Sequence, residues 1–492
     1  MITFPLLLPF AGALLAFLLP RRATPAVGIA TASATLVAVG RLTTALLENG
    51  AQRYSSGGWP APLGIQFHVD GLSATMLLMT AVVGTLVTVY AARHFRSDPA
   101  EPFFWPLWLF LWGGLNALYL SGDLFNLYVS LEVVGLSAVA LAALSGNRAA
   151  LKAALGYLFA AMVASLAYLL GVGLLYANYG VLDLETLGPM LRPDLPTHAA
   201  VGLTMTGLLV KTALFPMHFW LPSAHSAAPA PVSALLSALV IKGSYYLALR
   251  LWFSVFQPVV TFEAGQFIGV LGSAAILWGA FQALRQRRMK LLIAHSTVGQ
   301  VGYLFLLFPL ATVPRMAGEP APWINEAWMG GIYQALSHGF AKAAIFLAAG
   351  VILKAAGSDR LASMRDIAGR LPVVTFAFGL AGLSLIGLPP SGGFVAKWMM
   401  LRAILASGQW WWAPVVLLGG LLTAGYVFLM IRYAFKPAAG VLDLKPTPRI
   451  MQWVALVLAL IAVLLGFNVE GVMRLLEIGS PYSPSLGEGG EP

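Results

Sequence analysis

Apolar runs of the length that crosses a lipid bilayer recur along the whole chain. A transmembrane helix needs about 20 consecutive apolar residues, and the 492-residue chain holds fourteen such runs. We place them at residues 3–20, 25–47, 71–92, 103–121, 124–145, 155–177, 197–219, 230–254, 264–284, 291–311, 328–353, 371–406, 412–435 and 450–472. Because lipid offers the backbone no hydrogen-bond partner, each run is expected to be helical. The sequence therefore predicts an all-α polytopic membrane protein.

The composition excludes a soluble protein. Charged residues make up 10% of the chain, whereas soluble domains carry about 25%. The chain has no cysteine, so it can hold neither a disulfide nor an iron–sulfur cluster bound by thiolates. No spacing of histidines and carboxylates is typical of a zinc site, and no glycine-rich phosphate loop follows a strand. We therefore expect no metal and no cofactor, and any electron-transfer centre would lie in a partner.

The basic residues indicate how the chain is oriented in the membrane. Cytoplasmic loops of membrane proteins are rich in lysine and arginine, so the net charge of +10 indicates topology and not a nucleic-acid partner. With the first loop cytoplasmic, alternate loops hold 18 basic residues and the opposite loops and tails hold 4. The 18 include Lys290, which we assign to the loop after residue 284. This asymmetry predicts that both termini face outward.

Four lysines lie well inside the apolar runs: Lys211, Lys242, Lys342 and Lys397. An ionisable side chain at the bilayer centre costs at least about 2.5–3.5 kcal/mol, and a buried lysine can take up and release a proton near neutral pH. This set favours a proton path. The alternative is that each lysine only pairs with a carboxylate or reaches the interface. Arg41, Arg250 and Arg402 lie near run ends and are expected to reach the interface.

Glu132 is the only carboxylate in the middle of a run. An unpaired buried carboxylate would be protonated or would need a cation. Beside Lys211 or Lys242, Glu132 would form an ion pair whose opening and closing controls proton uptake. The alternative is a static pair that fixes the register of two helices.

Histidines add groups that titrate near pH 6.5 and can pass protons through two ring nitrogens. His338 precedes Lys342 by four residues and therefore shares its helix face. His295 opens a polar run. The run contains Ser296, Thr297 and Gln300. Although a lone intramembrane histidine often only bonds to a neighbouring helix, this grouping favours a hydrated path. The mouth of the path is expected near two further histidines, His218 and His225.

Two runs are predicted to be broken helices. Pro216 follows Lys211 by five residues, and Lys397 follows the Pro389–Pro390 pair by seven. Broken helices in corresponding positions of two halves are typical of transporters, although either break alone could be a packing kink. The breaks lie in the seventh and twelfth spans, which suits two five-helix inverted repeats, spans 4–8 and 9–13. The predicted domains are residues 1–100 with spans 1–3, 101–260 and 261–440 with the two repeats, and 441–492 with span 14 and an outward tail.

Several segments together carry a resemblance to a known family. They are residues 69–73, 123–132, 210–222, 224–229, 232–242, 290–303, 337–342 and 387–397. In these segments the chain resembles the antiporter-like subunits shared by respiratory complex I, membrane-bound hydrogenases and multisubunit Mrp cation/proton antiporters. The resemblance implies a fourteen-helix, proton-translocating subunit with a relay of buried residues. The positions of that relay are held here by Glu132, Lys211, Lys242, His338 and Lys397, to which the residue pattern adds Lys342.

Among these relatives the chain is most similar to the D-type subunit of Mrp antiporters, because it ends soon after the fourteenth span. The resemblance implies a non-enzymatic subunit of a sodium/proton antiporter in a bacterial or archaeal cell membrane. Its partners would be other membrane subunits, the lipid bilayer, protons and Na⁺, with no nucleic acid. Two alternatives stay open at this point. One is the proton-pumping arm of a complex I-like or hydrogenase redox complex, and the other is a scaffold whose buried charges only hold helices in register.

Overall fold

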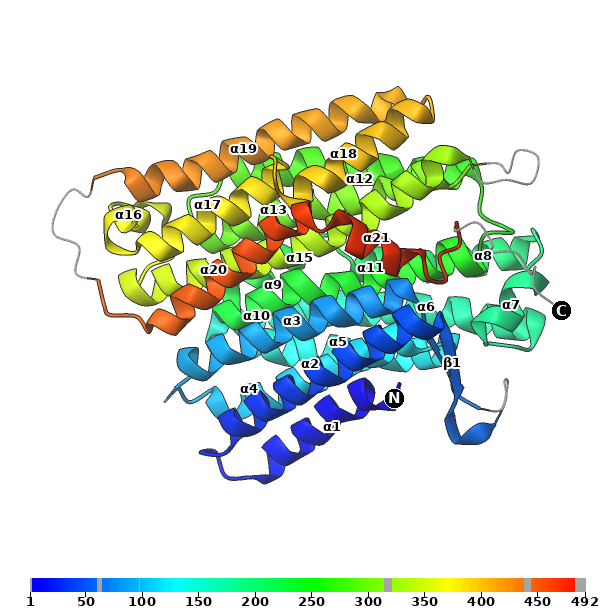
Figure 1. Cartoon of the computed structure of the whole chain (residues 1–492), viewed down its shortest axis with the longest axis horizontal. Coiled ribbons are helices and arrows are strands. Elements are labelled where there is room, and N and C mark those ends of the chain that lie inside the picture. Colours follow the sequence, from blue (N-terminus) through cyan, green and yellow to red (C-terminus); the bar gives the residue numbers. More distant parts are fainter. Residues whose placement is uncertain (1, 60–63, 97, 314–320, 438–443, 483–492) are drawn as a thin grey trace.

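The computed structural model describes residues 2–59, 64–96, 98–313, 321–437 and 444–482. Its long helices lie side by side and run along one common direction (Figure 1). The helices of the first part are α1 (Thr3–Leu18), α2 (Thr24–Asn49), α3 (Gly71–His94), α4 (Glu101–Leu120), α5 (Leu124–Ala143), α6 (Arg148–Tyr179), α7 (Leu184–Met190), α8 (Leu195–Lys211), α9 (Leu221–Ala227), α10 (Ala230–Leu235) and α11 (Ile241–Arg250). Those of the second part are α12 (Phe262–Leu284), α13 (Met289–Phe305), α14 (Leu307–Ala311), α15 (Pro322–Ala356), α16 (Ile367–Arg370), α17 (Pro372–Ile386), α18 (Gly392–Ala406), α19 (Ala413–Phe435), α20 (Arg449–Leu464) and α21 (Val469–Glu477).

The predicted spans are confirmed as helices. Within the described ranges, eleven helical segments are long and apolar enough to cross a membrane. The shorter α1 and the two interrupted crossings, α8–α9 and α17–α18, account for the other predicted spans. The described ranges contain one sheet, an antiparallel hairpin of β1 (Gln52–Ser55) and β2 (Gln66–Val69) that hydropathy did not predict. The chain is an all-helical membrane protein apart from this hairpin.

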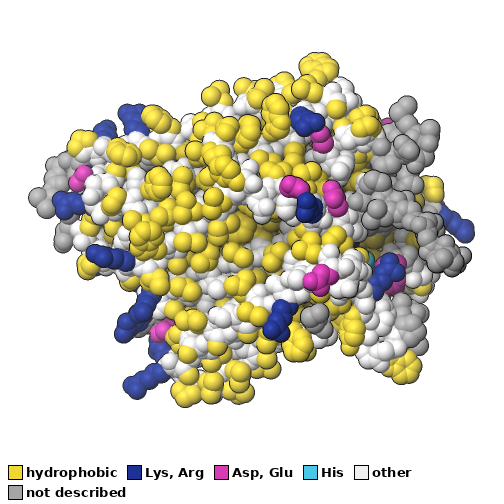
Figure 2. Space-filling view, in the orientation of Figure 1, with side chains coloured by type: hydrophobic (Ala, Val, Ile, Leu, Met, Phe, Trp, Pro, Cys, Tyr) yellow, Lys and Arg dark blue, Asp and Glu magenta, His cyan; other side chains and the backbone are white. Residues whose placement is uncertain are grey.

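The outside of the bundle is apolar, as a lipid-facing surface must be. On α6, exposed large side chains recur every three or four residues, which places them on one helix face. This exposed stripe consists of Leu151, Leu155, Phe159, Met162, Val163, Leu166 and Leu170. Figure 2 shows hydrophobic side chains across the face of the molecule, with lysines and arginines more frequent towards the end at the left than over the middle. We call this end, where α1 turns into α2, α3 into α4 and α5 into α6, the basic face.

Small residues let neighbouring helices approach closely, which is the usual basis of helix packing in lipid. A methyl group on Gly279 of α12 would lie 2.3 Å from the backbone nitrogen of Gly299 of α13. A methyl group on Gly207 of α8 would lie 2.4 Å from the carbonyl oxygen of Ala164 of α6. Helix α15 is buried along most of its length at the centre of the bundle. Buried polar residues on α15 are therefore surrounded by protein and not by lipid.

Both predicted helix breaks are confirmed. Helix α8 ends at Lys211, and helical structure resumes at Leu221, so the interruption begins directly after the lysine. Helix α17 ends at Ile386 and α18 begins at Gly392. An interrupted helix leaves backbone carbonyl groups without their helical partners, and such groups are tolerated at membrane depth only within protein or a wet cavity. That the two halves are inverted repeats, and the domain limits that follow from it, stay predictions.

Two assignments made from the sequence were wrong. Lys290 does not lie in a loop: it is the second residue of α13, and the residue is only 3% exposed. The fourteenth span does not run to residue 472, because α20 ends at Leu464 and α21 is a separate helix. Helix α21 packs on α3, and its buried residues are Leu475 and Leu476. The apolar residues at its start therefore belong to a short packed helix and not to the end of the fourteenth span.

Candidate proton path

The predicted ion pair of the first half is present. Nζ of Lys211 lies 3.3 Å from Oε1 of Glu132, and Ser165 of α6 also donates a hydrogen bond to that oxygen. The Lys211 side chain is 9% exposed and that of Glu132 29% exposed. A cation that is nearly buried next to a partly exposed carboxylate can be held when the pair is closed and released when the carboxylate turns outward. The geometry therefore suits a pair that opens and closes.

A small cavity lies beside Lys211 on the side of the next helix. Its volume is about 20 Å³, and its lining includes Lys211, Val240 and Ser244. A water molecule needs about 10–15 Å³ of such space. Thr212, the first residue of the break, donates a hydrogen bond of 3.0 Å to Ser244. The first break is thus connected by polar contacts to the segment that carries Lys242.

Lys242 lies inside the protein next to a π-helical turn, η2 (Leu236–Val240). The residue is fully buried, and its Nζ donates a 2.6 Å hydrogen bond to the carbonyl oxygen of Ser237. A π-helical turn shifts the backbone hydrogen-bonding pattern and is frequent at functional sites. The hydroxyl groups of Ser237 and Thr297 lie 3.0 Å apart, which joins this turn to α13 in the second half.

Lys342 reaches the same short stretch of α13. Its Nζ donates to the carbonyl oxygen of Ile293 at 3.1 Å and also to the hydroxyl of Ser296. The Thr297 hydroxyl donates to the same Ile293 carbonyl at 3.0 Å. Lys242 and Lys342 are therefore connected through Ser237, Thr297 and Ile293 by polar contacts between the two halves of the chain.

His338 lies one helical turn before Lys342 on α15 but makes no hydrogen bond to Lys342 or to the described side chains around it. It is 1% exposed, and neither ring nitrogen has a hydrogen-bond partner among the described residues. The charges of Lys242, Lys342 and Lys397 all act on it. Buried polar atoms are nearly always hydrogen-bonded, so an unpartnered imidazole calls for a water or a functional explanation. A buried, unpartnered imidazole on which three lysine charges act is a candidate for exchanging protons among them.

The path continues to Lys397 along α13. Gln300, one turn after Ser296, donates to the carbonyl of Leu385 at 3.2 Å, and Lys397 donates to the same carbonyl at 2.9 Å. Lys397 also donates to the carbonyl of Ile386, and its Nζ lies 4.3 Å from the centre of the Tyr303 ring. Leu385 and Ile386 end α17, so the lysine binds the carbonyl groups that the second break leaves free.

The remaining predicted histidines lie apart from this chain of contacts. His225 is fully buried, and neither ring nitrogen has a hydrogen-bond partner in the described part of the chain. His218 stacks on Phe215 within the first break, with ring centres 5.5 Å apart. His218 and His295 act on each other electrostatically, but both are only partly buried. In the described ranges, no three histidine or carboxylate side chains come together as a metal site would require.

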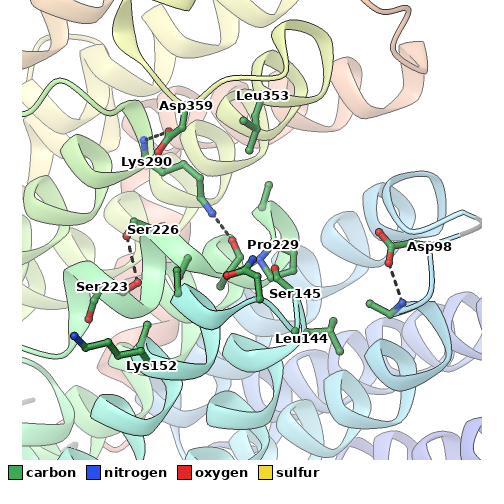
Figure 3. Close-up of a pocket in the computed structure, with 18 of the residues that line it drawn as sticks. Asp98, Leu144, Ser145, Lys152, Ser223, Ser226, Pro229, Lys290, Leu353 and Asp359 are labelled. Atoms are coloured by element: carbon green, nitrogen blue, oxygen red, sulfur yellow. Dashed lines mark hydrogen bonds between the residues drawn. The ribbon is translucent and has the colours of Figure 1, made fainter.

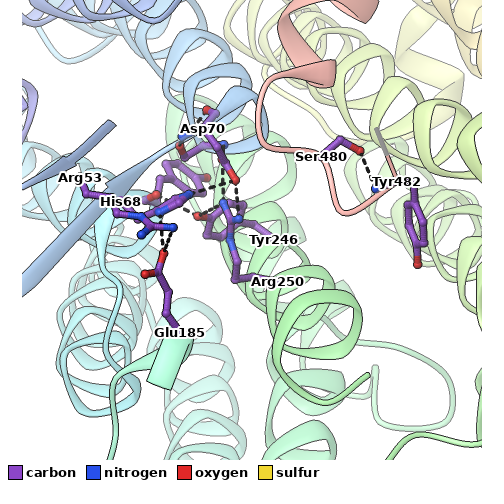
Figure 4. Close-up of polar contacts among 10 residues, drawn as sticks. Arg53, His68, Asp70, Glu185, Tyr246, Arg250, Ser480 and Tyr482 are labelled. Carbon is purple, nitrogen blue, oxygen red and sulfur yellow. Dashed lines mark hydrogen bonds and ion pairs between the residues drawn. The ribbon is translucent and has the colours of Figure 1, made fainter. Parts of the chain in front are cut away.

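Arg250 lies at the end of α11, as expected, but its side chain is only 12% exposed because it pairs with a buried carboxylate. Its Nη2 lies 2.8 Å from Oδ1 of Asp70, and it also bonds to the Tyr246 hydroxyl. Asp70 caps the start of α3 and is 1% exposed. Burial alone would raise the pKa of the Asp70 carboxyl, but the Arg250 guanidinium outweighs burial and holds that pKa well below its usual range. Figure 4 shows this pair next to His68. The pair lies at the start of α3, at the end of the bundle opposite the basic face.

Sequence reasoning missed several residues of the path. Ser237 and Ser244 are single serines in an apolar run, and only their spacing of five and two residues from Lys242 could have indicated a role. Tyr303 closed the polar run that begins at His295, but nothing in the run showed that it would contact Lys397. Lys290 was assigned to a loop because three arginines lie just before it in the sequence.

The comparisons with known proteins agree with this architecture. Residues 121–423 match the family model described as "NADH:quinone oxidoreductase/Mrp antiporter, TM". Residues 60–105 match the model described as "NADH-Ubiquinone oxidoreductase (complex I), chain 5 N-terminus". The first match covers more than half of the chain and contains both helix breaks.

Curated relatives carry the names of two kinds of complex. The chain is 34% identical over 462 residues to the N subunit of the NADH-quinone oxidoreductase of Desulforudis audaxviator, covering 90% of each chain. It is 28% identical over 499 residues to the D subunit of the Na(+)/H(+) antiporter of Bacillus subtilis, covering 99% of this chain and 96% of the relative. A chain in the structure of the Mrp complex from Dietzia has the same fold, with a TM-score of 0.87, 24% identity, and coverage of 98% of this chain and 97% of that one. The chain belongs to the family of antiporter-like membrane subunits that complex I and Mrp antiporters share.

Proposed function

We propose that the chain is the proton-translocating membrane subunit of a multisubunit Mrp-type cation/proton antiporter, with Na⁺ as the exchanged cation. The observation that carries the proposal is the series of polar contacts that joins Lys242 to Lys342 across the two halves, through Ser237, Thr297 and Ile293. The Glu132–Lys211 pair lies at one end of this series, beside the segment of Lys242, and Lys397 shares an acceptor carbonyl with Gln300 at the other. Buried charges that only hold two helices in register need one partner each. They do not need a connected series across both halves of a bundle.

In the proposed mechanism each lysine alternates between its amine and ammonium forms. A proton received at Lys211 moves through the small cavity and Ser244 to Lys242. It then passes along the hydroxyl groups of Ser237 and Thr297, or through the unpartnered ring of His338, to Lys342. Carbonyl oxygens such as that of Ile293 hold the ammonium groups but carry no proton themselves. Gln300 and the second break then position Lys397 as the last carrier.

The orientation of the subunit follows from the loops. The basic face would be cytoplasmic by the positive-inside rule. The N-terminal end of α1 and the C-terminal end of α20 point to the opposite side (Figure 1), so both termini would lie outside the cell. A partly exposed Glu132 side chain would be costly against lipid. This supports a neighbouring membrane subunit on the side of the bundle where Glu132 is exposed.

The assignment to an Mrp-type complex is supported by the nearly end-to-end match with the Bacillus subtilis antiporter protein. In such an assembly Na⁺ could cross through another subunit while protons follow the path described above. A second candidate is favoured by the higher identity to the N subunit of a quinone oxidoreductase. In that case the same path would move protons with energy from redox chemistry on partner subunits.

Purifying the native complex and identifying its subunits by mass spectrometry separates the two candidates. We expect small membrane subunits, and Na⁺-dependent dissipation of a pH gradient when the complex is reconstituted into liposomes. Subunits with iron–sulfur or flavin groups, together with no Na⁺ dependence, would overturn the antiporter assignment in favour of the redox-linked one.

A further inference from the structure

A large cavity opens at the basic face, away from the helix breaks. It has a volume of about 1170 Å³ and lies among the α3–α4, α5–α6 and α9–α10 connections and the start of α13. Its charged and titratable lining residues are His94, Asp98, Lys152, Arg288, Lys290 and Asp359. Backbone and hydroxyl groups of Ser145, Ser223 and Ser226 add to this lining. A cavity of this size and polarity holds many water molecules.

Lys290 is the lining residue that leads from this cavity into the protein. Its backbone N–H donates a 2.8 Å hydrogen bond to Oδ1 of Asp359, while Oδ2 of Asp359 accepts from Arg288 at 3.0 Å. The Lys290 side chain extends away from that carboxylate, and its ammonium group donates to the carbonyl oxygen of Ala228 (Figure 3). Asp359 thus fixes the backbone of Lys290, while the ammonium group lies next to the α9–α10 link.

His225 lies behind that link. It is 0% exposed and neither ring nitrogen has a hydrogen-bond partner among the described residues. The Ser233 hydroxyl donates to the carbonyl oxygens of both His225 and Ala228, at 2.7 and 3.3 Å, which holds the histidine next to the Lys290 acceptor. The His225 ring stacks on Phe346, with ring centres 5.6 Å apart. Phe346 is one turn after Lys342 on α15, and the charges of Lys290 and Lys342 both act on His225.

We propose that this cavity is a hydrated intake vestibule. Lys290 and His225 carry protons from it to Lys342, which lies where the two halves of the chain meet. The inference rests on the proposed function, to which it adds a second entrance. A proton moves from vestibule water to the Lys290 amine, which becomes an ammonium. The ammonium transfers a proton to a ring nitrogen of His225, and the imidazolium transfers one to the Lys342 amine. The first transfer breaks an O–H bond of hydronium and forms an N–H bond, leaving water, and each later transfer breaks one N–H bond and forms another, so charge and protons balance.

The absence of cysteine from the chain allows a chemical test of this role. Lys290→Cys introduces the only thiol of this chain. The reagent 2-bromoethylamine converts it into a side chain ending in an amine, and iodoacetamide into one of similar length ending in an amide. Both products can donate a hydrogen bond to the Ala228 carbonyl, but only the amine exchanges protons. The whole complex is reconstituted, alkylation is verified by mass spectrometry, and proton flux is measured with a pH-sensitive dye.

We expect Lys290→Cys to lower flux about 100-fold, in the range typical of a lost proton-transfer group. The amine should restore flux and the amide should not. Restoration by both reagents would make Lys290 a structural residue, and restoration by neither, unchanged flux in Lys290→Cys, or failure to alkylate would each overturn the proposal. Arg287→Gln removes an exposed cation three residues before Lys290 that does not line the vestibule. It is the control and should leave flux unchanged.

Two cysteine variants test the vestibule, and a third variant, Lys242→Gln, separates this inference from the proposed function. Ser226→Cys in the vestibule should react with a membrane-impermeant thiol reagent only from the basic face, and Ser254→Cys, which lines a cavity at the other end, only from the opposite side. The reverse pattern would overturn the vestibule. If Lys242→Gln keeps full flux, the proposed function itself fails. If Lys242→Gln stops flux while Lys290→Cys does not lower it, only the second entrance fails.

Discussion

The two broken helices hold their lysines in different ways. Lys211 at the first break pairs with a carboxylate on another helix, Glu132. Lys397 at the second break binds the carbonyl groups of Leu385 and Ile386, and within the described ranges it makes no ion pair with a carboxylate. A carboxylate on a neighbouring helix can move away as a unit, whereas the carbonyl groups of a helix end are fixed by the backbone.

On the basis of this difference we propose different roles for the two lysines. The first break is built to change its affinity for a proton when the ion pair opens. The second break offers a fixed, partly polar seat from which a proton can leave. The halves therefore resemble each other in their broken helices and differ in what controls the charge.

The largest expected effect is on transport at the second break. Lys397→Met removes the last carrier, so proton flux through the reconstituted complex should fall about 100-fold with normal assembly. Arg402→Met on the same helix is the control, since Arg402 is exposed and paired with Glu326, and it should retain flux. Comparable flux in Lys397→Met and Arg402→Met would remove Lys397 from the path.

The next prediction concerns the stability of the protein when the ion pair at the first break is removed. Glu132→Gln leaves Lys211 without its counterion and should lower the free energy of unfolding by about 1–2 kcal/mol. This is less than the loss for a fully buried pair because Glu132 is partly exposed. Adding Lys211→Met should recover most of that loss, as thermal unfolding of the purified complex can measure. Additive losses in the double variant would show that the two side chains do not interact.

A last pair of variants concerns the glycines beside the lysines. Gly387 has φ +88° and a methyl group there would lie 2.7 Å from Cδ of Lys397, so Gly387→Ala should destabilise the protein by about 1–3 kcal/mol. A methyl group on Gly135 would lie 3.6 Å from Nζ of Lys211, an ordinary contact, and alanine favours a helix. Gly135→Ala should therefore leave stability unchanged or slightly raised. Equal thermal stabilities of the two variants would contradict a rigid seat at Lys397.

The sequence predicted the helical crossings and both breaks because hydropathy and proline act locally along the chain. It also predicted that Glu132 would pair with Lys211 or Lys242, since a lone mid-span carboxylate needs a cation, and the structure shows the pair with Lys211. It could not place Lys290 or Arg250, because a basic residue near a helix end can either reach water or turn inward, and the choice depends on partners such as Asp70 that are distant in sequence. The β1–β2 hairpin and the π-helical turn beside Lys242 likewise depend on tertiary packing, which leaves no period in the sequence.

The central claim is that one proton path crosses both halves of the chain through Lys242. The most direct measurement is proton flux through the reconstituted complex carrying Lys242→Gln, compared with the unaltered protein at equal subunit content. Glutamine can still donate a hydrogen bond towards the Ser237 carbonyl but cannot exchange a proton. We therefore expect flux to fall about 100-fold. Flux equal to that of the unaltered protein would contradict a path through Lys242.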